Sequence, residues 1–124
     1  MKILVVDDEK DVQILFEQRF RKEIRDGVFN FSFCHSGEEA MTYLREHPLE
    51  VVMILSDINM PGMSGLELLR QIRQTTPVPP PVVMMITAYG DAEKYNQAMQ
   101  LGANGFIHKP VDFNALKQQL MSLQ

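Results

Sequence analysis

The sequence predicts an α/β fold in which an open parallel sheet is covered by helices on both sides. Five short apolar runs alternate with stretches of helical periodicity, which is the element order of a parallel sheet with helical crossovers. Polar residues follow the runs directly, as they do where such strands end. With 124 residues and 45% apolar composition, residues 1–124 have room for one domain with one well-buried core.

The predicted strands are short runs that are apolar and rich in β-branched or aromatic residues. The first, residues 3–6, is continuous and stops at acidic residues, which is typical of a strand buried on both faces of a parallel sheet. Similar runs follow at residues 29–34, 51–55, 82–86 and 105–108. Together they predict one five-stranded sheet.

One helix is expected between the first two strands, because apolar residues recur there with helical period. On a wheel at 100° per residue, one stripe holds Val12, Leu15, Phe16 and Phe20, with Ile24 at its edge. We expect this stripe to pack against the sheet. Ile14 lies on the opposite side of the wheel, among charged residues.

Three later helices have recognisable starting residues. Ser36 and Ser64 are each followed three residues later by a glutamate, a spacing that predicts a capping box. Asp112 precedes another amphipathic stretch and is expected to cap the last helix through its carboxylate.

Composition argues against several classes of function. A formal net charge of −4 with scattered basic residues does not suit binding to nucleic acid phosphates. The single cysteine, Cys34, cannot form an internal disulfide, and no apolar run approaches the length needed to span a bilayer. We therefore expect a cytoplasmic protein that binds neither nucleic acid nor membrane.

The polar residues at the ends of the predicted strands form a coherent set. Because the carboxyl ends of parallel strands meet at one edge of the sheet, we expect the following residues to lie together: Asp7, Asp8, Asp57, Thr87 and Lys109. Two carboxylates about 4 Å apart repel each other by about 4 kcal/mol at an effective dielectric of about 20. Lys109 offsets part of this repulsion, and an all-oxygen cluster also suits Mg²⁺.

This set of side chains suits phosphoryl transfer. The transition state of that reaction needs a metal, a cation and hydrogen-bond donors around the phosphoryl oxygens. Asp57 lies between the acidic pair and Lys109, where a carboxylate can act as nucleophile and carry an acyl phosphate. Thr87 can supply a hydroxyl donor.

Over its whole length the chain resembles the receiver domains of two-component response regulators. The resemblance is carried by five motifs in the same order and at matching spacing: residues 5–9 (VVDDE), 56–65 (SDINMPGMSG), 86–88 (ITA), 102–106 (GANGF) and 109–110 (KP). It implies a flavodoxin-like, doubly wound sheet in the order 2-1-3-4-5, flanked by five helices.

The resemblance also implies roles for individual residues. Asp57 would accept a phosphoryl group from a histidine kinase or a phosphotransfer protein. Asp8, Asp57 and the carbonyl of Asn59 would bind Mg²⁺ directly, and Asp7 would do so through water. Such a protein catalyses only its own phosphorylation and dephosphorylation, and it is otherwise not an enzyme.

Further roles concern the bound phosphoryl group and the response to it. Lys109 would pair with the group, and Thr87 and the Ala88 amide would contact its other oxygens. A cis peptide bond is implied before Pro110. In receivers a shift of the threonine is coupled to rotation of an aromatic residue in the fifth strand, which is Phe106 in this chain.

The lifetime of the phosphoryl group and the docking of the kinase are attributed to three more residues. Asn59 and Tyr89 would flank the path of attacking water, and the bulk of Tyr89 predicts slow self-dephosphorylation. Receivers dock their kinase along the first helix, so Ile14, an apolar residue with charged neighbours, is expected to contact the kinase.

Three other interpretations fit the sequence less well. A flavodoxin-like electron carrier needs a phosphate-binding loop after the first strand, where Asp7-Asp8-Glu9 would repel phosphate. A phosphatase with an aspartate nucleophile on that strand usually has a second acid two residues later, a spacing that the pair Asp7-Asp8 lacks. A degenerate receiver would not need Asp8, Asp57, Thr87 and Lys109 together. The sequence leaves open whether this is a complete regulator or a module with a downstream effector domain.

Overall fold

The computed structural model describes residues 1–48, 50–75, 80–88 and 92–122. Its centre is a parallel sheet in the order β2-β1-β3-β4-β5, which confirms the predicted order. The strands are β1 (Lys2–Val6), β2 (Asn30–Cys34), β3 (Met53–Asp57), β4 (Val82–Thr87) and β5 (Gly105–His108). The strands β1, β3 and β4 are almost entirely buried because helices cover both faces of the sheet.

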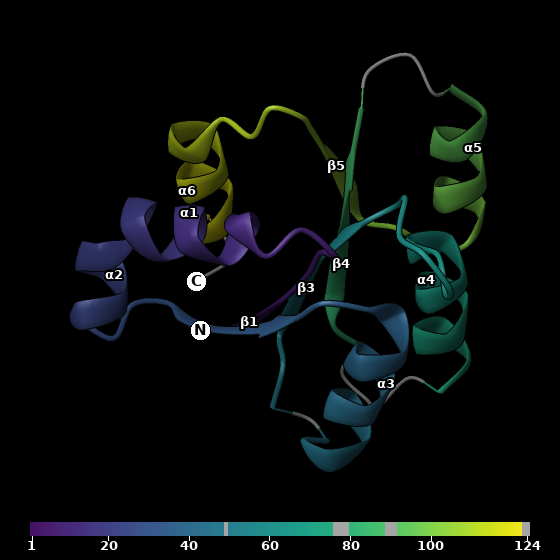
Figure 1. Ribbon diagram of the computed structural model, residues 1–124, viewed down its shortest axis with the longest axis horizontal. Coiled ribbons are helices and arrows are strands. Elements are labelled where there is room, and N and C mark those ends of the chain that lie inside the picture. The colour runs from purple at the N-terminus through teal and green to yellow at the C-terminus, as the bar shows by residue number, and fades with distance from the viewer. Residues whose placement is uncertain (49, 76–79, 89–91, 123–124) are drawn as a thin grey trace.

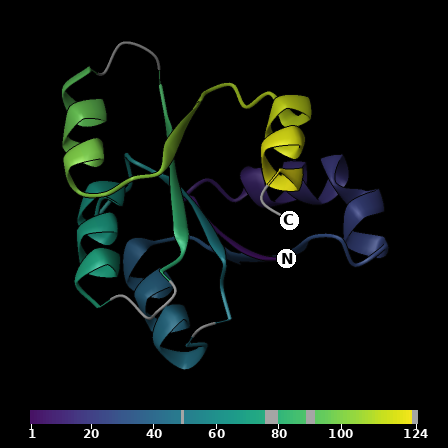
Figure 2. The same ribbon diagram turned by 180° about the vertical axis from the view of Figure 1, so that it is seen from behind.

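Six helices surround the sheet in the described part of the chain. Figures 1 and 2 show one group on one side of the sheet, namely α1 (Asp11–Arg19), α2 (Arg21–Arg25) and α6 (Phe113–Met121). On the other side lie α3 (Gly37–Glu46), α4 (Gly65–Gln74) and α5 (Ala92–Gln100). None of the described helices is long and apolar enough to cross a membrane.

The prediction of five helices is wrong because the first predicted helix is two. Phe20 has φ −109° and ψ 22°, outside the helical range, and it separates α1 from α2. Its ring is buried and packs edge-on against Phe29, with ring centroids 5.6 Å apart. Figure 1 shows that the chain changes direction between α1 and α2, at the residue whose ring is anchored in the core.

The helical wheel for residues 12–24 is confirmed in part. Phe16 and Phe20 are buried, as predicted, and Ile14 is exposed. Leu15 and Ile24, however, are 43% and 37% exposed, so their assignment to the buried face is wrong. Leu15 lies at the margin of the stripe, and Ile24 follows the break at Phe20, beyond which a single wheel no longer applies.

The helix α2 contains a buried carboxylate. Glu23 is only 8% exposed, and its Oε2 lies 3.2 Å from Nζ of Lys117 on α6. The ion pair joins α2 to α6, and the paired ammonium explains how the buried charge is tolerated.

Phenylalanine is unevenly distributed in the core. Six of the seven phenylalanines lie on the α1 side and contact one another, with ring centroids between 5.2 and 6.2 Å apart: Phe16, Phe20, Phe29, Phe31, Phe33 and Phe113. The core on the other side is built from aliphatic residues and methionine, with Phe106 at its margin.

The predicted helix starts are confirmed. The Ser36 hydroxyl accepts a hydrogen bond from the Glu39 amide, and Ser64 likewise accepts one from Glu67. Asp112 accepts hydrogen bonds from the amides of Asn114 and Ala115. Among the described residues, neither glutamate accepts from the amide of its capping serine, as a full capping box would have it. The Glu39 carboxylate accepts from the His35 amide, and Glu67 accepts from the side chains of Arg70 and Gln71.

Candidate functional site

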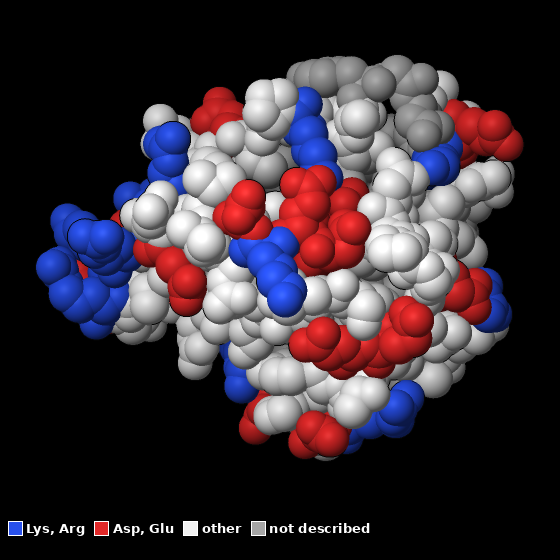
Figure 3. Space-filling model, in the orientation of Figure 1, with Lys and Arg blue, Asp and Glu red and all other residues white. Residues whose placement is uncertain are grey.

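The predicted site residues meet at the carboxyl edge of the sheet. Asp7 follows β1, Asp57 is the last residue of β3, Thr87 is the last of β4, and Lys109 follows β5. Strand pairing fixes their neighbourhood, because Val6 of β1 pairs with Ser56 of β3 and Asp57 pairs with Ile86 of β4. Figure 3 shows acidic side chains gathered near the middle of this face with basic side chains beside them.

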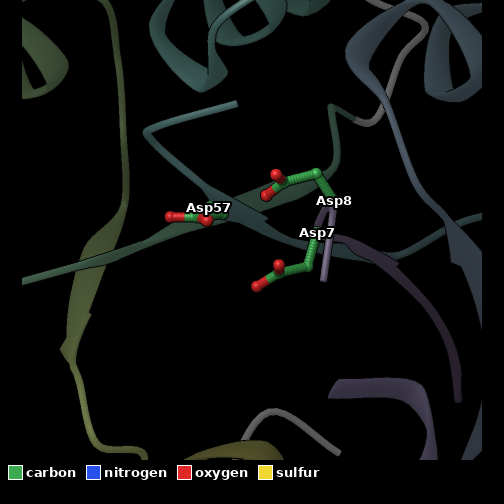
Figure 4. A group of neighbouring side chains, drawn as sticks. All are labelled: Asp7, Asp8 and Asp57. Carbon is green, nitrogen blue, oxygen red and sulfur yellow. The ribbon is translucent and has the colours of Figure 1, made fainter. Parts of the chain in front are cut away.

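Three carboxylates form the centre of the site. One oxygen each from Asp7, Asp8 and Asp57 lies within 4.8 Å of the others, and the three side chains point to the same side (Figure 4). Asp7 and Asp57 are both buried, whereas Asp8 is exposed. The sequence prediction that these acids converge is confirmed.

One oxygen of this cluster lacks a hydrogen-bond donor. Asp7 Oδ1 accepts a hydrogen bond of 2.9 Å from the Glu9 amide. Asp7 Oδ2 is buried, and in the described part of the chain it has no hydrogen-bond partner. Its nearest cation is Nζ of Lys109, 3.9 Å away. A buried, unsatisfied carboxylate oxygen beside two other carboxylates fits a hard divalent cation.

The surroundings of Asp7 disfavour its charge. Burial raises the pKa of Asp7, and the nearby Asp57 carboxylate raises it further, while the Glu9 amide and Lys109 lower it in part. Ionised Asp7 therefore costs free energy in the metal-free protein.

Lys109 supplies the cation within the cluster. Its Nζ donates to Asp57 Oδ2 at 3.2 Å. Partial burial alone would lower the pKa of Lys109, but Asp57 and then Asp7 more than offset this and raise it. Lys109 is therefore an ammonium at neutral pH, as its predicted role requires.

The backbone around Asp57 is held from several directions. The Asn59 amide donates to Asp57 Oδ1 at 3.4 Å, and the Ser56 hydroxyl donates to the Asp57 carbonyl at 3.0 Å. Gly65 passes so close that a Cβ built on it would lie 2.0 Å from the Asp57 carbonyl oxygen. The sequence contains this glycine in a matching motif, but only the structure gives the reason for it.

The fourth and fifth strands complete the site. Thr87 is buried, and its hydroxyl donates to the Ala88 carbonyl at 3.3 Å. The Lys109 amide donates to the Thr87 carbonyl at 2.9 Å, which ties the two strand ends together. The peptide bond between Lys109 and Pro110 is cis, as the resemblance implied.

Comparison with known proteins identifies the family. The family model of the response regulator receiver domain matches residues 3–121. The chain belongs to this family. It is thus a receiver domain of two-component response regulators, which removes the electron-carrier and phosphatase interpretations.

Two relatives and one solved structure illustrate the similarity. The receiver domain is 35% identical to the chemotaxis protein CheY-3 of Vibrio cholerae over 97% of its own length and 88% of that protein. It is 36% identical to the response regulator protein PilR of Pseudomonas aeruginosa, covering 94% of this chain but only 24% of PilR. A crystal structure of a response regulator receiver domain protein from Clostridium thermocellum superposes with a TM-score of 0.83 at 26% identity, over 98% of this chain and 91% of the other.

The predicted switch residue of the receiver domain has a partner that the sequence did not indicate. Phe106 in β5 is half-buried, and its ring stacks on Tyr95 of α5 with centroids 4.3 Å apart. Tyr95 is 43% exposed. Phe106 pairs in register with Met85, two residues before Thr87 along β4.

Of the two residues predicted to tune the lifetime of the phosphoryl group, the structure describes only Asn59. Asn59 is exposed, and its side-chain oxygen accepts a hydrogen bond from the ammonium of Lys94 on α5. Lys94 was not expected at the site, and its distance from Asn59 in the sequence explains why. Tyr89 lies outside the residues that the structure describes.

The predicted kinase contact lies close to a groove that leads to the site. Ile14 on α1 is 52% exposed. A groove of about 360 Å³ runs between α1 and the segment after β5, and its lining includes Asp7, Leu15, Lys109 and Val111. Ile14 is not among the lining residues, whereas the neighbouring Leu15 is.

Proposed function

We propose that residues 1–124 form a receiver domain that works as a phosphorylation switch, with Asp57 as the phosphoacceptor. The observation that carries this proposal is the convergence of Asp7, Asp8 and Asp57 around one space, with Lys109 bound to Asp57. Family membership also supports it, because the receiver-domain model matches residues 3–121, a range that contains all four residues.

Mg²⁺ is the proposed cofactor. Asp7, Asp8 and Asp57 would hold it with the carbonyl of Asn59, and the unsatisfied Oδ2 of Asp7 supports this assignment. When bound, the ion would neutralise negative charge on the phosphoryl oxygens and lower the barrier to transfer. The chain's own residues would align the two reactants.

The proposed reaction moves a phosphoryl group from a phosphohistidine to Asp57. The bond between phosphorus and the histidine nitrogen breaks, and a bond between phosphorus and a carboxylate oxygen of Asp57 forms. Lys109 would turn its ammonium from Asp57 Oδ2 toward the new phosphoryl oxygens. The Thr87 hydroxyl, which now donates to the Ala88 carbonyl, would turn to the same group, and the Ala88 amide would donate to it as well.

Movement of Thr87 is the proposed start of the signal. A threonine that turns toward the phosphoryl group vacates space along β4, and Phe106 on the neighbouring strand could move into it. The stack of Phe106 on Tyr95 would then have to change, which would alter the exposed surface of α5. A downstream partner or effector domain would read that surface.

Removal of the phosphoryl group would depend on access of water to the acyl phosphate. Asn59 lies beside Asp57, where water would approach the acyl phosphate, and its contact with Lys94 places a cation there. Asn59 and Tyr89 remain the proposed tuning residues. Both transfers would be catalysed on the protein itself, and no separate substrate is proposed.

The proposed partner is a histidine kinase or a phosphotransfer protein that docks over the groove beside α1. Ile14 and Leu15 would supply apolar contacts, with charged residues around them. The proposed setting is the cytoplasm, where phosphodonors derived from ATP are made. No direct nucleic acid contact is proposed for this domain, because its net charge is −4.

The proposal is tested with acetyl phosphate, a small phosphodonor that needs no docking surface. The wild-type protein should gain one base-labile phosphoryl group in the presence of Mg²⁺ and none after chelation, as read by intact-protein mass spectrometry. Asp57→Asn should gain none at this site. Asp26→Asn, which removes an exposed carboxylate directly after α2, is the matched control and should be labelled like the wild type. Equal labelling of residue 57 in the Asp57→Asn protein would refute the assignment.

A further inference from the structure

The loop between β3 and α4 is fastened to the start of α3. This loop, residues 58–64, carries Asn59, whose carbonyl is a proposed Mg²⁺ ligand. Its inner part is held by the sheet, since the Ile58 amide donates to the Ile86 carbonyl at 3.1 Å and Met60 is buried. Its outer part, by contrast, contacts α3, an element that contributes nothing else to the site.

A carboxylate from α3 holds the outer part of the loop. Glu38 Oε1 accepts a hydrogen bond of 3.2 Å from the Met63 amide, although the two residues are 25 positions apart. Its other oxygen, Oε2, lies 2.8 Å from the place where a Cβ of residue 62 would stand. Residue 62 is glycine with φ +72°, so the loop both turns there and leaves room for the carboxylate.

A second contact joins the same two segments. Gly37, the first residue of α3, has no side chain where Met63 packs, because a Cβ there would lie 2.8 Å from Met63 Sδ and 2.9 Å from Met63 Cβ. The pair of glycines, Gly37 and Gly62, thus lets the helix and the loop approach each other. The Glu38 hydrogen bond then fixes their relative position.

We propose that Glu38 is a positioning residue for the metal site, holding the loop so that the Asn59 carbonyl stays in place beside Asp57. This inference rests on the proposed function, because it assumes that the acidic cluster binds Mg²⁺. Loss of the hydrogen bond would free the Met63 amide and the outer loop, so that binding the ion would include the cost of ordering this segment. Glu38 itself does not touch the ion.

Glu38 also has a simpler role, and the test must separate the two. A carboxylate in the first turn of α3 is favoured by the helix dipole, an effect that depends on its charge. Glutamine keeps the side-chain oxygen that accepts from Met63 but removes the charge. Glu38→Gln should therefore keep the positioning role and lose only the effect of the charge, whereas Glu38→Ala should lose both.

The experiment is calorimetric titration of the full chain with Mg²⁺, together with hydrogen exchange of the Met63 amide. Glu38→Ala should bind Mg²⁺ about fivefold more weakly, equivalent to about 1 kcal/mol for one hydrogen bond, and its Met63 amide should exchange faster. Glu38→Gln should stay within about twofold of the wild type, a difference of less than about 0.5 kcal/mol. Glu46→Ala, an exposed glutamate at the other end of α3, controls for the change in net charge and should match the wild type.

Each contrary result has a definite meaning. Unchanged Mg²⁺ affinity in Glu38→Ala, or an equal loss in Glu38→Gln, would overturn the positioning role. Unchanged exchange of the Met63 amide in Glu38→Ala would overturn it even without a metal measurement. If the wild-type protein bound no Mg²⁺ at all, the proposed function would fail as well, and the variants would not be needed to show it.

Discussion

Replacing Asp7 with asparagine is expected to stabilise the metal-free protein. The Asp7 carboxylate is buried, and one of its oxygens has no hydrogen-bond partner among the described residues. Asparagine keeps the oxygen that accepts from the Glu9 amide and removes the charge. The change therefore retains this hydrogen bond and relieves the repulsion, and it loses the attraction to Lys109.

The size of the effect follows from the distances. At an effective dielectric of about 20, repulsion from Asp57 and from Asp8 costs about 3 kcal/mol each if their oxygens are 4.8 Å from that of Asp7. Attraction to Lys109 Nζ at 3.9 Å offsets about 4 kcal/mol of this. The remainder is about 2 kcal/mol of destabilisation, or about 8 °C in Tm for a chain of this size.

The stability gained by Asp7→Asn should depend on pH. Because the folded-state pKa of Asp7 lies above its unfolded value, the folded protein binds this proton more tightly than the unfolded chain does. Asp7 therefore does not destabilise the fold below its unfolded pKa, where it is neutral in both states. Its destabilising effect grows as pH rises through the folded pKa. Asp7→Asn should gain most at neutral pH and little in acid, where the wild-type carboxyl is already neutral.

Urea unfolding of both proteins, at pH 7 and in acid, measures the effect. The midpoint should rise in Asp7→Asn with an unchanged dependence on urea, and addition of Mg²⁺ should stabilise the wild type more than the variant. Asp11→Asn, which removes an exposed carboxylate of α1, should not show this gain. A variant less stable than the wild type at pH 7, or equally stabilised in acid, would show that charge repulsion at Asp7 does not control the stability of the metal-free protein.

Two further predictions concern signalling. Lys109→Ala should fold and keep Mg²⁺ binding, perturbed only by loss of the competing cation, yet its amide spectrum should change much less than that of the wild type on addition of beryllofluoride; an equal change would contradict the role of Lys109. Ile14→Glu and Leu15→Glu should each slow phosphotransfer from the cognate kinase at least tenfold, about 1.4 kcal/mol, without slowing labelling by acetyl phosphate. Val52→Glu, a similarly exposed aliphatic position before β3, is the control. If neither substitution on α1 slows the kinase, the groove is not its docking surface; if acetyl phosphate also slows, the site itself is disturbed.

Much of the fold was predictable because its determinants are local. The apolar runs placed the strand ends to within two residues, and the short-range rule for helix caps placed Ser36, Ser64 and Asp112 correctly. The acidic cluster was predictable as well, since the ends of parallel strands must meet. These inferences need only sequence spacing and the geometry of a sheet.

What the sequence did not reveal depends on long-range packing. The break at Phe20 follows from how that ring enters the core, and it makes a single helical wheel fail for Ile24. No local pattern indicates that Glu23 is buried, because its partner, Lys117, lies near the other end of the chain. The contacts of Glu38 with Met63 and of Lys94 with Asn59 likewise join segments whose closeness no local pattern indicates.

The uneven distribution of phenylalanine provides a way to observe the two sides of the domain separately. The sequence contains no tryptophan, so fluorescence of that residue cannot report on switching. Fluorinated phenylalanine would place six labels in the cluster beneath α1 and a single label on the opposite side, at Phe106. In a ¹⁹F spectrum the isolated resonance should shift when its stacking on Tyr95 changes, while the remaining six serve as an internal reference from the unswitched core.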